Sequence, residues 1–157
     1  MPKETFLTRH FGFVEPECDE DGLYGGCLVS KSQSNVLYWA SYTGTLTGLI
    51  GILNGYIWLG TGTMIGAMFA RNYWIDPRYS WRRTVDISWV QLLIWTHLWA
   101  AFSSPQFIPY CVIQLIGSVS YGISWYLHKI GDSWGSTFMH TMVHVCANSS
   151  LLLLYTS

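Results

Sequence analysis

Long stretches of this chain lack any charged side chain. Asp, Glu, Lys and Arg are all absent from residues 32–70, 87–128 and 133–157. The eight basic and nine acidic residues are confined to the windows 1–31, 71–86 and 129–132. A soluble domain needs charged helix and strand faces toward water, so this absence excludes an ordinary soluble fold. A charge at the centre of a bilayer costs about 2.5–3.5 kcal/mol on insertion scales, and charge-free blocks are therefore typical of membrane spans.

Other familiar signals are missing as well. The four cysteines form no CxxC pair and have no metal-ligand spacing, and the net charge of −1 gives no basic surplus for nucleic acid. Residues 1–21 carry eight charged side chains and no apolar run long enough for the core of a cleavable signal. Cys18 and Cys27 flank an acidic stretch that contains glycine, and a disulfide across it is one open prediction.

Aromatic residues are plentiful, at 17% of the chain with nine Trp and ten Tyr. Many of them lie where a charge-free block meets a charged window, as amphipathic rings do at the two interfaces of a membrane. The rings at these junctions are Tyr38, Trp39, Tyr73, Trp74, Trp81, Trp89, Trp125, Tyr126, Trp134 and Tyr155.

The fold class that we predict is all-α: a polytopic membrane bundle, residues 35–157, behind a polar acidic arm, residues 1–34. As one helix, the block 36–70 would be about 52 Å long, well beyond a hydrocarbon core of about 30 Å. Asn54-Gly55 in its middle is a turn signal, which favours a helical hairpin and five spans in total. A bundle of four spans is the alternative. The expected spans are about 36–53, 56–71, 87–103, 107–127 and 134–154.

Glycines recur in the predicted hairpin at the spacing that lets helix backbones approach closely. This spacing predicts helix packing rather than contact with lipid alone. The glycines concerned are Gly44, Gly48, Gly51, Gly55, Gly62 and Gly66.

Basic residues predict the orientation of the bundle. The Arg-rich loop at 71–87 and the turn at Lys129 are separated by two predicted spans, so the positive-inside rule places both on the same side. With five spans the acidic arm lies beside the Arg-rich loop, and with four it lies across the membrane. Trp and Arg in this loop suit either lipid headgroups or an acidic partner surface. The predicted lipid- or partner-binding residues are Trp74, Arg78, Trp81, Arg82 and Arg83.

Three histidines fall inside predicted spans. His140 and His144 share one helix face with Asn148, at i, i+4 and i+8, and His97 lies in an earlier span. Two histidines one turn apart can share a zinc ion, and a third from another helix would complete a catalytic-type site with an open position. The alternative is hydrogen bonding between helices, which we favour, with Asn148 among the helix-packing residues. The preferred prediction therefore contains no metal site and no catalytic residue, and the zinc site of His97, His140 and His144 is its alternative.

The chain resembles a group of small multispan membrane proteins of large (giant) DNA viruses and microalgae. The resemblance would cover residues 36–155, and it implies a virion or organelle membrane protein without an assigned enzyme activity. It rests on Asn72-Tyr73-Trp74, Pro77, Tyr79-Ser80-Trp81-Arg82-Arg83, Asp86, His97, Ser136-Thr137, His140, His144 and Asn148.

A weaker resemblance concerns the early His97 and the terminal pair His140 and His144. This arrangement is similar to membrane hydrolases of the ceramidase and adiponectin-receptor type, in which three histidines hold zinc. It implies a zinc-dependent hydrolase of lipid amides, although the chain is shorter than that larger helical core requires.

The preferred hypothesis is a non-catalytic integral membrane protein. It would be a structural or accessory subunit of a large assembly, such as the capsid–inner membrane shell of a virion or a mitochondrial complex. Its partners would be membrane lipids and other subunits, reached in part through the arm. Its location would be a virion internal membrane or a host or organelle membrane. The zinc hydrolase is the alternative, with zinc as its cofactor.

Overall fold

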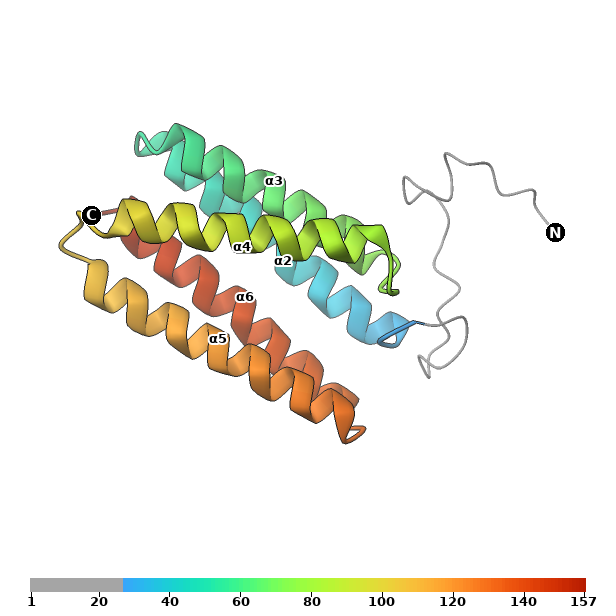
Figure 1. Ribbon diagram of the computed structural model, residues 1–157. Helices are drawn as coiled ribbons and strands as arrows, with labels where there is room; N and C mark the ends of the chain where they lie inside the picture. Colours follow the sequence, from blue (N-terminus) through green and yellow to red (C-terminus); the bar gives the residue numbers. More distant parts are fainter. Residues whose placement is uncertain (1–26) are drawn as a thin grey trace, which may run out of the picture.

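The computed structural model describes residues 27–157, which form five helices (Figure 1). The described residues contain no strand, only an isolated bridge between Cys27 and Arg78, so the all-α prediction is confirmed for this part of the chain. Most of the arm, with Cys18 of the predicted disulfide, lies outside the described residues. The helices are α2 (Lys31–Leu53), α3 (Ile57–Trp74), α4 (Trp81–Ala101), α5 (Phe107–Lys129) and α6 (Ser133–Tyr155).

The ambiguous block at 36–70 forms two helices rather than one. Helix α2 ends at Leu53, and Gly55 has a φ of +90°, a conformation that glycine adopts readily because it has no Cβ. Tyr56 N then donates to Gly51 O at 2.9 Å and closes the turn before α3. The predicted hairpin is therefore present, with α3 extending three residues beyond the predicted 71.

Three helices, α2, α5 and α6, are long and apolar enough to cross a membrane. Helices α3 and α4 are part of the same bundle. Helix α2 packs closely on α3, and α5 on α6, while α6 also packs on α2 and α4 on α3. By close backbone contact each helix neighbours the next in the series α4, α3, α2, α6, α5, and side chains of α3 and α4 also reach α6. The first and last members barely touch, and Figure 1 shows them diverging from the loop that joins them.

Glycines make the tight contact between α2 and α3 possible. A Cβ on Gly48 would lie 2.5 Å from the carbonyl oxygen of Gly60, so the two backbones are in direct contact. On the other side of α3, a Cβ on Gly66 would lie 2.8 Å from Leu93 of α4. Small residues therefore set the spacing of three successive helices, as is common for helices packed in a bilayer.

The bundle has many large apolar side chains on its outside, and its interior mixes apolar with polar side chains. Trp58, Trp99 and Leu53 are 89%, 85% and 76% exposed, which in water would be unusual for so many large apolar groups. The interior in turn holds hydroxyls, an amide and an imidazole. The apolar outside fits a surface covered by lipid tails. Buried polar residues include Gln33, Ser34, Ser41, Thr47, Thr63, His97, Ser120, Ser124, Ser136, Thr137 and Ser150.

Charge is concentrated at one end of the bundle. The first residues of α2, α4 and α6 and the last of α3 and α5 meet there, and every charged side chain of residues 27–157 lies at or near these helix ends. The opposite end, formed by the turns at 54–56 and 102–106 and by residues 156–157, has no charged side chain. The charged residues are Lys31, Arg71, Asp76, Arg78, Arg82, Arg83, Asp86, Lys129 and Asp132.

The chain that leads into α2 is fixed to the Arg-rich loop. Leu28 N donates to Pro77 O at 2.9 Å, next to the bridge between Cys27 and Arg78. Ser30 then caps α2: its side chain accepts a hydrogen bond from Gln33 N, and its own N–H donates to Gln33 Oε1 at 3.0 Å. The described end of the arm therefore lies beside the Arg-rich loop.

Candidate functional site

A hydrogen-bonded group of three side chains joins α3, α4 and α6. The hydroxyl of Tyr155 lies 2.6 Å from Nε2 of His97 and 3.0 Å from Oγ1 of Thr63. Nδ1 of His97 lies 2.8 Å from Leu93 O, one turn back in its own helix. Both ring nitrogens of this histidine therefore have partners, and the residue is 1% exposed. It acts as a polar link between helices.

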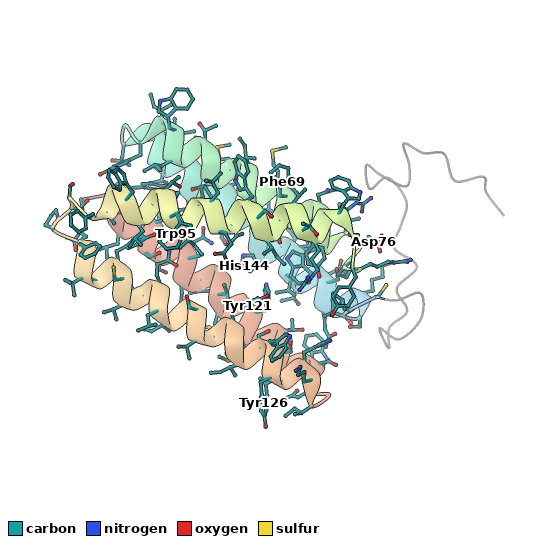
Figure 2. The ribbon with its side chains drawn as sticks, viewed as in Figure 1. Phe69, Asp76, Trp95, Tyr121, Tyr126 and His144 are labelled. Atoms are coloured by element: carbon teal, nitrogen blue, oxygen red, sulfur yellow. The ribbon has the colours of Figure 1, made fainter. Side chains whose placement is uncertain are left out.

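The other two histidines lie on α6, nearer the charged end. The ring of His140 packs edge-on against Trp74 of α3 and Tyr121 of α5, with centroids 5.1 and 5.9 Å apart. The centroid of the His144 ring is 5.7 Å from that of His140. Figure 2 labels His144 and Tyr121 between α4 and α5. Nε2 of His144 is buried and has no hydrogen-bond partner among residues 27–157.

The structure does not bring the three histidines together. His97 bonds Tyr155 at the last turn of α6, whereas His140 is the eighth residue of that helix. Fifteen residues of helix, about 22 Å at 1.5 Å each, separate Tyr155 from His140. Residues 27–157 contain no group of three His, Cys, Asp or Glu side chains that could hold a metal ion. The geometry therefore gives the predicted zinc ligands no common centre.

Asn148, predicted as a helix-packing residue, links α6 to α2. Its Nδ2 donates to Oγ1 of Thr43 at 2.8 Å and to the carbonyl oxygen of His144 at 2.7 Å.

The predicted helix-packing glycines differ in what they do. Gly44, Gly48, Gly51, Gly62 and Gly66 lie against neighbouring helices, whereas Gly55 forms the turn, with nothing within 4 Å of a Cβ built on it.

Polar pairs of the same kind join most of the packed helices. Between α5 and α6, Gln114 donates to Ser150 at 2.8 Å. Between α3 and α4, the indole N–H of Trp89 donates to Gly62 O at 2.9 Å. Because lipid offers no hydrogen bonds, each such pair removes an unsatisfied polar group and fixes the rotation of a helix.

The five residues predicted to bind lipid or a partner divide into two sets. Trp74 and Arg82 are 6% and 5% exposed, so they are parts of the protein interior. Trp81 is 50% exposed, Arg78 forms an ion pair with Asp76 at 2.7 Å, and Arg83 lies over a tyrosine ring. The second set forms the accessible part of the Arg-rich loop.

Cations at the charged end lie over aromatic rings. The guanidinium of Arg71 is 4.3 Å from the ring centroid of Tyr42, and the ammonium of Lys129 is 3.6 Å from that of Trp125. These pairs combine the ring's attraction for a cation with the preference of both groups for a headgroup layer.

One important residue was assigned the wrong role from the sequence. Tyr155 was expected to be an interfacial ring, but it is 1% exposed and forms the centre of the three-helix hydrogen-bonded group. Its position near the end of a span is shared by interfacial and buried tyrosines, so the sequence contained no signal that separates them.

No protein-family model, characterised protein or solved structure matches this chain. The interpretation of its function therefore depends on its own residues and their arrangement.

Proposed function

We propose that the chain is a non-catalytic integral membrane subunit that crosses the bilayer five times and anchors a larger assembly. The virion capsid–inner membrane shell and the mitochondrial complex are the two assemblies that we consider, with the virion internal membrane or an organelle membrane as the location. The partners are membrane lipids and the neighbouring subunits of that assembly.

The concentration of charge at one end of the bundle carries this proposal. All charged side chains of residues 27–157 lie there, and the chain that leads into α2 is bound to the Arg-rich loop at the same end. The arm and the accessible residues Arg78, Trp81 and Arg83 can therefore contact one partner together. The other end presents only uncharged turns, and the outer surface between them is apolar, as a membrane anchor requires.

The interior of the bundle suits support rather than catalysis. Many of its hydroxyls and amides, and His97, are used in hydrogen bonds between helices or within one helix. A scaffold needs such links because helices in lipid lack a hydrophobic driving force for association.

Native electrophoresis of the tagged chain from its source cells, in mild detergent, tests the proposal. The full chain should migrate in a complex much larger than its 17.9 kDa. Deletion of residues 1–26 should release it as a free protein that still resists alkaline extraction from membranes. The paired substitution Arg78→Gln and Arg83→Gln should weaken the complex, whereas Lys129→Gln, on another turn, serves as the control. A full-length chain that always migrates alone, or a deletion that stays in the complex, would overturn the proposal.

A further inference from the structure

The outer face of α4 carries a row of polar side chains. Thr84, Ser88, Gln91 and Trp95 are spaced i, i+4, i+7 and i+11, so they share one face, and all four are exposed. The opposite face of the helix, which includes Leu93, packs on the glycines of α3. Helix α4 is nearest the viewer in Figure 1, with no other helix in front of it.

The amide of Gln91 has no hydrogen-bond partner among residues 27–157. The described part of the chain shows no hydrogen bond from the side chains of Gln91, Ser88 or Thr84. Gln91 is the midpoint of α4, ten residues from each end, which places it about 15 Å from either end of the helix. If α4 crosses a bilayer, this amide would face hydrocarbon, where an unsatisfied polar group is costly.

Helix α5, the other outermost helix, shows what a lipid-facing surface looks like in this protein. Val112, Leu115 and Val119 lie on its outer face and are 51%, 65% and 54% exposed. That face is aliphatic along most of its length, whereas the outer face of α4 offers hydrogen-bonding groups over three turns. Helix α4 is also not one of the three helices that are long and apolar enough to cross a membrane. Its polar face therefore calls for another protein rather than lipid.

A second copy of the same chain fits this face. A glutamine amide has both a donor and an acceptor, so the same residue on a two-fold related copy satisfies both groups. In a parallel pair of α4 helices Gln91 would meet Gln91, and Ser88 would meet Ser88. The face has no charged side chain from Thr84 to Trp95, so two copies in the same orientation meet no like-charge repulsion along it.

We propose that the chain forms a parallel dimer in the membrane through this face of α4, with the Gln91 amides hydrogen-bonded to each other across the two-fold axis. This inference rests on the proposed function, because it requires α4 to cross the bilayer.

Disulfide trapping in liposomes tests the dimer. The purified full chain, with its four native cysteines replaced by serine or alanine, would carry either Gln91→Cys or, as the matched control on α5, Val119→Cys. Under mild oxidation, Gln91→Cys should form a covalent dimer and Val119→Cys should not. Resistance to alkaline extraction is measured on the same samples. Extraction of the protein would contradict the proposed membrane function, whereas inserted protein with equal trapping at both positions would overturn the dimer alone.

Substitution of the amide supplies a second readout. By Förster transfer between labelled copies in liposomes, Gln91→Leu should lower the association constant about fivefold, and Val119→Leu should leave it unchanged. Equal association of Gln91→Leu and the parent chain would overturn the role of the amide. In native membranes, a crosslink from Gln91→Cys to a different protein, without the dimer, would overturn the choice of a second copy.

Discussion

The hydroxyl oxygen of Tyr155 lies 2.6 Å from Nε2 of His97, and this contact joins the last turn of α6 to a residue four positions before the end of α4. Thr63 of α3 completes the group at 3.0 Å from the same oxygen. One tyrosine therefore fixes the relative rotation of three helices. Because lipid offers no hydrogen bonds, such an internal link is a specific means of holding membrane helices together.

Tyr155→Phe should destabilise the bundle by about 1–3 kcal/mol, because Nε2 of His97 would keep its burial and lose its close partner. The midpoint of thermal unfolding in detergent measures the effect. Tyr126→Phe, at a tyrosine that is 59% exposed, is the control and should change the midpoint little. Equal midpoints for both variants would show that the contact contributes nothing to stability.

Glycine substitutions should have opposite effects at two positions. Gly48→Ala places a Cβ 2.5 Å from Gly60 O, so it should push α2 and α3 apart and destabilise the protein by about 1–3 kcal/mol. Gly122→Ala meets nothing within 4 Å and should stabilise α5 by about 0.5–1 kcal/mol. The same unfolding measurement compares the two, and a stable Gly48→Ala variant would refute the close contact of the two backbones.

Asn148→Leu should weaken the contact between α6 and α2, because Thr43 loses the donor at 2.8 Å. Hydrogen bonds between membrane helices contribute about 0.6 kcal/mol on average and about 1.7 kcal/mol at most. The neighbouring Ser149→Leu, at an exposed position, should leave stability unchanged or raise it slightly. A reversed order of the two variants in the unfolding assay would contradict the assignment of Asn148 to the interface.

Zinc analysis separates the structural hypothesis from the hydrolase. Because His97 bonds Tyr155, which lies fifteen residues from His140 along α6, the purified chain should contain much less than one zinc ion per molecule. His97→Gln should not change the metal content. One bound zinc per chain, lost in both His97→Gln and His144→Gln, would instead support the hydrolase.

The sequence predicted the helices well because their limits depend on local chemistry. The Asn54-Gly55 turn ends α2 through the left-handed conformation of Gly55, and charged windows or prolines interrupt the chain between the later helices. The length of the block 36–70 and its central turn signal together favoured two helices over one. These signals need no knowledge of which helix neighbours which.

The contacts between helices could not be predicted in the same way. Trp74 and Arg82 have the residue types of a membrane-surface loop, yet they lie in the interior because α3 and α4 turn them inward. His97 could equally have faced His140 or Tyr155, which lie on the same helix. It faces Tyr155 because both residues lie toward the uncharged end of the bundle, whereas His140 lies toward the charged end. Which side chain each residue contacts depends on the tertiary arrangement of the helices. The spacing of residues along one helix does not encode that arrangement.

Cysteine accessibility in sealed vesicles tests the central claim, the five-span bundle with one charged side. Single cysteines replace Tyr79 in the Arg-rich loop, Asn54 in the hairpin turn and Ser103 in the uncharged loop, all exposed positions. A membrane-impermeant maleimide should label Tyr79→Cys from one side, and Asn54→Cys and Ser103→Cys only from the other. Labelling of Asn54→Cys and Tyr79→Cys from the same side would contradict the five-span account.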